Sequence, residues 1–141
     1  MPIKEDWLSQ VEEEILEPDM PVIDPHHHLW DRPDGRYMVE DLQADLATGH
    51  NIVSTVFVEC ASMYRPDGPE RLRPVGETEF VNSVAAKCAQ QNSPTTPRIC
   101  EGIVGHADLT LGAKVDEVLD AHIAAAPERF RGVRHSVSWD A

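Results

Sequence analysis

The sequence contains few cysteines, few basic residues and no long apolar run. Cys60, Cys88 and Cys100 form no CxxC pair and are odd in number, which excludes a disulfide framework and indicates thiols in a reducing compartment. Only 12 lysines and arginines face 25 acidic residues, and the net charge of −13 repels nucleic acid. No apolar stretch approaches the roughly 20 residues that span a bilayer, and the acidic N-terminus lacks a signal-peptide core. We therefore expect a cytoplasmic protein that binds neither nucleic acid nor a membrane.

Helical and extended patterns alternate along the chain. Amphipathic periodicity, with proline and glycine as stop signals, predicts helices over residues 5–16, 38–48, 77–90 and 111–126. Apolar, β-branched runs predict strands over residues 21–30, 52–58, 99–105 and 130–138. The last helix has an apolar stripe that leaves His122 at the surface; the stripe is Val115, Val118, Leu119 and Ile123. Composition predicts a single domain over residues 1–141, in which residues 1–19 form an N-terminal helical extension.

Strands that alternate with helices of this length indicate βαβ units and a parallel α/β sheet. Such a sheet either stays open or closes into a barrel. No GxGxxG or Walker-type loop follows a strand, so nothing in the sequence supports a nucleotide-binding open sheet.

Polar residues follow the ends of all four predicted strands, where the sites of parallel α/β folds lie. The most informative are His26 and His28 in the first strand. Alternate residues of a strand face the same side, so these two imidazoles project together while His27 points away. Two imidazoles one step apart on one face can bind a single zinc ion.

Four segments resemble the amidohydrolase-related family, metal-dependent (β/α)8-barrel hydrolases that include sugar lactonases. They are VIDPHHHLWD (residues 22–31), TVFVEC (55–60), GIVG (102–105) and PERFRGVR (127–134). The resemblance implies a TIM-type barrel of which this chain contains about the first four β/α units, that is, the N-terminal half. A complete barrel takes roughly 250 residues.

The resemblance also implies a divalent metal, commonly zinc in this family, bound by His26 and His28. Such a metal lowers the pKa of bound water and polarises the scissile carbonyl. Some lactonases of this group work without a metal, and the two histidines would then bind substrate directly. The family's general base comes from a late strand, so we expect it beyond residue 141 and leave the catalytic residue unassigned.

Four residues near the strand ends are candidates for substrate binding: Glu59, Tyr64, Arg134 and His135. The planar guanidinium of Arg134 suits a carboxylate or carbonyl oxygen, although an ion pair between Glu59 and Arg134 is an equally good interpretation. His106 also follows a strand, and we assign it to the structure rather than to chemistry.

The favoured function is hydrolysis of a small-molecule lactone, or another cyclic ester or amide, by metal-activated water, in a chain that is a catalytically incomplete fragment. The alternative is a non-catalytic half barrel that forms a homo-oligomer or pairs with a separate C-terminal chain, because an open half barrel exposes sheet edges and an inner face.

Overall fold

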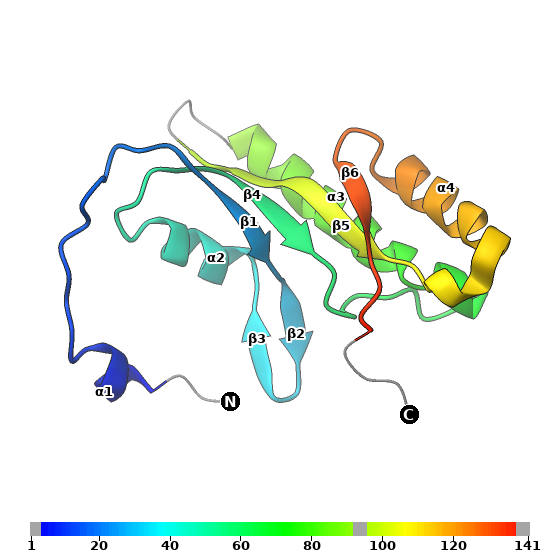
Figure 1. The fold of residues 1–141 in the computed structure, drawn as a ribbon, viewed down its shortest axis with the longest axis horizontal. Coiled ribbons are helices and arrows are strands. Elements are labelled where there is room, and N and C mark those ends of the chain that lie inside the picture. The colour runs from blue at the N-terminus through cyan, green and yellow to red at the C-terminus, as the bar shows by residue number, and fades with distance from the viewer. Residues whose placement is uncertain (1–3, 92–95, 138–141) are drawn as a thin grey trace.

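The computed structural model describes residues 4–91 and 96–137 (Figure 1). Its helices are Glu5–Leu8 (α1), Val39–Leu46 (α2), Val75–Gln91 (α3) and Val115–Ala125 (α4), with 3-10 turns at Glu70–Leu72 (η1) and Leu109–Lys114 (η2). Its strands are Val22–His27 (β1), Trp30–Arg32 (β2), Gly35–Tyr37 (β3), Ile52–Val58 (β4), Arg98–His106 (β5) and Phe130–Arg134 (β6). No helix in these ranges is both long enough and apolar enough to cross a membrane.

Four of the strands form one parallel sheet in the order β1-β4-β5-β6, and β2 and β3 form a separate antiparallel hairpin. Strand β1 pairs with β4, so that His27 lies beside Phe57. Strand β5 pairs with β6, so that His106 lies beside Arg134. All four strands of the parallel sheet run in the same direction, and their carboxyl ends therefore share one edge of the sheet.

The prediction of a (β/α)8-barrel type is wrong. The four parallel strands make an open sheet in which β1 and β6 each pair on one side only, within the described residues, so the protein is a small α/β domain rather than a piece of a barrel. The physical reason is that alternating strands and helices specify parallel neighbours but not closure. Open sheets and barrels share the same local pattern, and only the long-range strand order distinguishes them.

The helices α2, α3 and α4 cover one face of the sheet (Figure 1). Leu42 of α2 and Val81 of α3 belong to the same buried cluster as Phe57 of β4 and Ile103 of β5, together with Ala126 after α4. Burial of these side chains is the main favourable contribution to folding, at about 25 cal/mol for each Å² of apolar surface removed from water.

Helix α1 is shorter than predicted. It ends at Leu8 rather than at Leu16, and two apolar side chains predicted for its inner face are exposed, Trp7 at 67% and Val11 at 69%. An amphipathic helix of this length is marginal in water unless a surface buries its apolar side, and residues 4–91 and 96–137 leave these side chains exposed. At the other end, the strand predicted over 130–138 ends at Arg134, and its last predicted residue, Ser138, lies outside the described residues.

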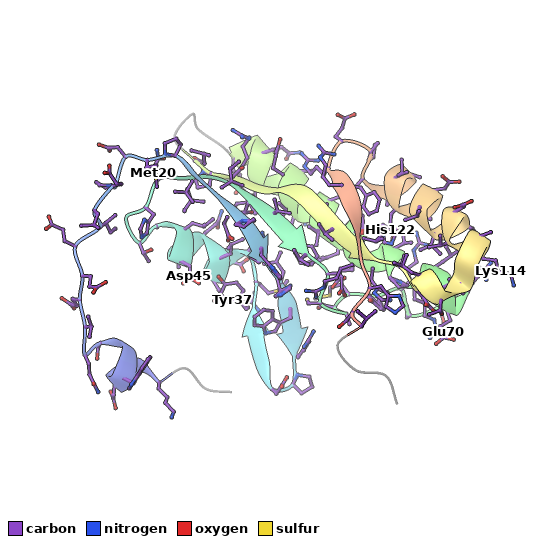
Figure 2. All side chains as sticks on the ribbon, in the orientation of Figure 1. Met20, Tyr37, Asp45, Glu70, Lys114 and His122 are labelled. Atoms are coloured by element: carbon purple, nitrogen blue, oxygen red, sulfur yellow. The ribbon has the colours of Figure 1, made fainter. Side chains whose placement is uncertain are left out.

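Helix α4 buries Val118 as predicted, but its buried side includes His122 in place of Ile123. Val118 and His122 are fully buried, whereas Ile123 is 51% exposed. His122 lies between α4 and the sheet (Figure 2), with its ring stacked on that of Phe130 at 5.0 Å. Its Nδ1 is 2.8 Å from the hydroxyl of Thr78, and its Nε2 donates to the carbonyl of His106 at 2.9 Å. A histidine can be buried in this way because both of its ring nitrogens have partners.

Candidate functional site

The carboxyl end of the sheet places several polar side chains on the face that the helices leave uncovered. A side chain added at Gly105 would meet His122 of α4, so Gly105 faces the helices. A side chain added at Gly102 would meet Val56 of β4, and Gly102 faces the open side of the sheet. Because side chains alternate along a strand, His106 points to the same side as Gly102. His106, which the sequence assigned to the structure, lies at the carboxyl end of β5.

His26 is exposed and His28 is half-buried, whereas His27 is buried. The rings of His26 and His28 are 4.9 Å apart and nearly perpendicular. The Nε2 of His27 is 2.9 Å from the Thr55 hydroxyl. Burial lowers the pKa of His27, which keeps its ring neutral. The two outward imidazoles are therefore available to a ligand, whereas His27 serves the core.

The ring of His28 is oriented as a metal-binding histidine would be. Its Nδ1 is 2.7 Å from the carbonyl oxygen of Val58. A carbonyl oxygen only accepts, so Nδ1 carries the proton and Nε2 keeps its lone pair. A backbone carbonyl on the second nitrogen is the usual way in which a ligating histidine is held. The chemistry of the donors thus fits a divalent metal, but within the described ranges no three His, Cys, Asp or Glu side chains are grouped to hold one.

Glu59 and Arg134, both predicted to bind substrate, bind each other. The Nε of Arg134 donates to Glu59 Oε1 at 2.7 Å, and Nη2 donates to the Glu59 backbone carbonyl at 2.5 Å. This ion pair joins the end of β4 to β6 across β5, and it neutralises the charge of both side chains. The guanidinium keeps its Nη1 donors, and Arg134 is partly exposed, so it can still donate to a neutral oxygen.

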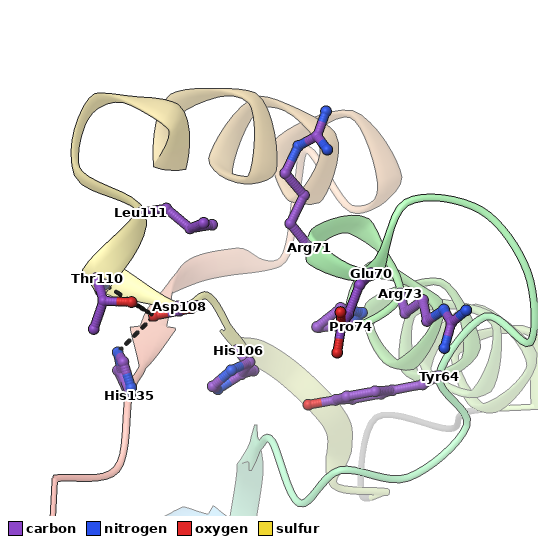
Figure 3. A pocket seen from close by; sticks show the side chains of 10 residues that line it. All are labelled: Tyr64, Glu70, Arg71, Arg73, Pro74, His106, Asp108, Thr110, Leu111 and His135. Atoms are coloured by element: carbon purple, nitrogen blue, oxygen red, sulfur yellow. Dashed lines mark hydrogen bonds and ion pairs between the residues drawn. The ribbon is translucent and has the colours of Figure 1, made fainter.

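A cavity of about 830 Å³ opens beside the ends of β5 and β6 (Figure 3). Tyr64 and His135, two of the predicted substrate-binding residues, line it together with His106. The other lining residues come mostly from η1 and η2 and the segments beside them: Glu70, Arg71, Arg73, Pro74, Asp108, Thr110 and Leu111. The structure thus brings Tyr64 and His135 together.

His26 lines a different cavity, of about 370 Å³, beside α2. Asp24, Asp45 and His50 also line this second cavity. The predicted metal pair and the predicted substrate residues Tyr64 and His135 therefore do not share one cavity.

His106 and His135 present different groups to the cavity of about 830 Å³, which we call the main cavity. The Nδ1 of His106 donates to the carbonyl of Arg134 at 3.1 Å, which leaves a lone pair on Nε2. The Nδ1 of His135 accepts from the backbone N–H of Leu109 at 2.9 Å, which puts the proton of the neutral ring on Nε2. The rings are 5.7 Å apart. One ring therefore offers an acceptor and its neighbour offers a donor.

The loop that carries Tyr64 is held by a buried carboxyl group that the sequence did not reveal. Glu77 Oε1 accepts from the backbone N–H groups of Cys60 and Ser62, at 3.1 and 2.8 Å. Between and beyond them, Ala61 and Met63 have positive φ angles of 58° and 55°, which are unfavourable for residues other than glycine. Burial raises the pKa of Glu77. In sequence, Glu77 resembles any acidic residue in the first turn of a helix, so only its burial indicates this role.

The comparisons with known proteins identify one relative of unknown activity. The chain is 30% identical to an uncharacterized protein, y4mH, of Sinorhizobium fredii, over 86% of this chain and 41% of that protein. The chain thus spans less than half the length of this relative. No protein-family profile matches the chain, and no solved structure matches it.

Proposed function

We propose that the protein is a hydrolase that opens a lactone, or another cyclic ester or amide, with activated water. The resemblance of the first strand and three further segments to the amidohydrolase-related family supports this function. The observation that carries it is the orientation of His28. Its Nδ1–H donates to the carbonyl of Val58, which leaves the lone pair of Nε2 available for a metal. The centres of the His26 and His28 rings are 4.9 Å apart.

His26 and His28 would hold a divalent metal, with zinc as the first choice because imidazole suits it. When bound, this metal supplies an activated water and polarises a carbonyl group. The remaining work falls to the chain. Val58 keeps the His28 ring in one orientation, and Arg134 can donate from Nη1 to a substrate oxygen while Glu59 holds it in place.

Calorimetric titration with Zn²⁺ tests the metal site. We expect H26A and H28A each to weaken zinc binding by more than about tenfold. Removal of only the hydrogen-bond partner of a metal-binding histidine already lowers metal affinity about ten- to a hundredfold. The control is H50A, which removes a histidine of the second cavity. Zinc binding that depends on His50 but not on His28 would place the ion in that cavity instead and contradict the assignment.

Hydrolysis is measured separately, as acid release from a panel of lactones by the zinc-loaded protein. We expect release above the uncatalysed rate, and a parallel loss in H28A. A folded, zinc-loaded protein that releases no acid from any lactone, cyclic ester or cyclic amide would show that the proposed function is wrong.

The open face and edges of the sheet favour a second candidate, association with a second copy of the chain without catalysis. Ile23 of the edge strand β1 is exposed, and β6 pairs on only one side within the described residues. Unpaired strand edges are templates for association. Light scattering on the metal-free protein distinguishes the candidates, since a stable dimer without hydrolysis supports association and an active monomer contradicts it.

A further inference from the structure

We propose that the main cavity is a second hydrolytic site, apart from His26 and His28, in which His106 is the general base and Tyr64 and His135 donate hydrogen bonds to the carbonyl oxygen of an uncharged lactone. This role rests on the proposed hydrolysis of lactones. It requires no metal, so its activity is measured on the zinc-free protein.

The hydrogen bonds of His106 make its Nε2 a base. The carbonyl of Arg134 takes the proton of Nδ1, so the neutral ring exposes an unprotonated Nε2. The backbone of His106 is also fixed, because His122 donates to its carbonyl at 2.9 Å. A side chain added at the adjacent Gly105 would lie 2.9 Å from the His122 ring, so the end of β5 and α4 are in close contact. The imidazole is therefore held by bonds at both its ring and its backbone.

Tyr64 and His135 supply the donors. Burial, with the nearby charges of Glu77 and Glu59, raises the pKa of Tyr64, so its hydroxyl keeps its proton at neutral pH. Figure 3 shows this hydroxyl directed toward the side of the cavity where His106 lies. The N–H of Leu109 fixes the opposite tautomer in His135 and leaves Nε2–H as a donor. Donors placed where negative charge develops on oxygen stabilise an acyl-transfer transition state.

The reaction balances with these groups alone and water. His106 Nε2 removes a proton from water as the water oxygen bonds to the lactone carbonyl carbon, and the carbonyl oxygen becomes an oxyanion that accepts from Tyr64 and His135. The oxyanion then collapses, and the ring C–O bond breaks. The alkoxide leaving group takes the proton back from Nε2. Lactone and water thus give one hydroxy acid, and His106 returns to its starting state.

The charges around the cavity favour an uncharged substrate. Its lining contains two arginines and two acidic residues, Arg71, Arg73, Glu70 and Asp108. Arg71 is already bound by Glu117, at 2.8 Å from Nε to Oε2. The pKa of Asp108 is lowered by hydrogen bonds from Thr110, so this carboxylate is charged and repels an anion. A volume of about 830 Å³ accommodates a small ring compound.

The variant H106N separates a base from a structural residue. The amide nitrogen of asparagine can replace Nδ1 as the donor to Arg134, but nothing replaces Nε2. We expect kcat to fall about 10²- to 10⁴-fold with little change in KM, and added imidazole to restore part of it in H106A. The control H50N, outside this cavity, should keep its activity. Full activity of H106N, in a protein that hydrolyses lactones, would overturn the role of His106 alone.

Long-range ¹H–¹⁵N spectra read the tautomers directly and need no substrate. In the neutral form of each ring, we expect Nε2 of His106 to carry no proton and Nε2 of His135 to carry one. The reverse pattern would overturn the assignment, whatever the activity. A tenfold preference for a lactone that bears a carboxylate over its uncharged analogue would overturn the substrate class. No hydrolysis by the unsubstituted protein would overturn the proposed function, and with it the role of His106.

Discussion

Lowering the pH from about 8 to about 5 should destabilise the protein through His122. The ring is fully buried, with Thr78 on one nitrogen and the His106 carbonyl on the other. Burial lowers its pKa below the value of about 6.5 that a histidine has in the unfolded chain. The unfolded state therefore binds one more proton than the folded state between these two pKa values. The stabilisation is complete above about pH 6.5 and is lost as the pH falls.

The size of the effect follows from the number of protons. One proton corresponds to a slope of at most about 1.4 kcal/mol per pH unit in the free energy of unfolding. His27, whose pKa burial also lowers, adds a slope of the same sign. Glu77 opposes both, because its raised pKa gives a stabilisation that is present at low pH and lost as the pH rises through that pKa. The net slope of the unsubstituted protein thus combines several groups, and a variant is needed to isolate His122.

Urea unfolding, followed by circular dichroism at a series of pH values, isolates the contribution of His122 in the variant H122Q. At about pH 8 we expect H122Q to be less stable by about 1–3 kcal/mol, since buried partners lose their hydrogen bonds. Below pH 6.5 the gap should close by up to about 1.4 kcal/mol per pH unit. The control is H50Q, which removes an exposed histidine. Equal pH slopes for H122Q and the unsubstituted protein would refute the reasoning.

Two further predictions concern packing and burial. Burial raises the pKa of the Cys100 thiol to about 12 and that of the Cys60 thiol to about 11. A thiol reagent at about pH 8 should therefore label both cysteines slowly until urea unfolds the protein. Rapid labelling of the folded protein would contradict this prediction. The variant G105A should lose about 1–3 kcal/mol of stability, because the new methyl group would lie 2.9 Å from the ring of His122. The control is G132A, whose methyl group would meet nothing within 4 Å. It should unfold at the same urea concentration as the unsubstituted protein.

Much of the secondary structure could be predicted from local pattern. The strand predicted over 52–58 is confirmed with the same bounds, and the helix predicted over 77–90 is observed at Val75–Gln91. Both rest on features that neighbouring residues share, namely β-branched side chains and helical periodicity. The helix predicted over 5–16 is wrong beyond Leu8, because its pattern required a packing surface and the described residues leave Trp7 and Val11 exposed.

Which candidate site residues come together depends on distance along the chain. Tyr64 and His135 could be named from their position after strands, and the structure places both in one cavity. The hydrogen-bond partners of His106 and Glu77 could not be predicted from the sequence. The proton of the His106 ring depends on a carbonyl 28 residues away, and the buried Glu77 holds a loop 15 to 17 residues before it.

By itself the sequence determined where strands and helices alternate, and that the polar residues follow the strand ends, because propensity and periodicity act over a few neighbouring residues. Only the tertiary structure decided that the sheet stays open, that α4 buries His122 rather than Ile123, and that Arg134 pairs with Glu59. These outcomes depend on contacts between segments far apart in the chain, and a local pattern does not specify which distant partner a hydrogen bond or an apolar side chain will have.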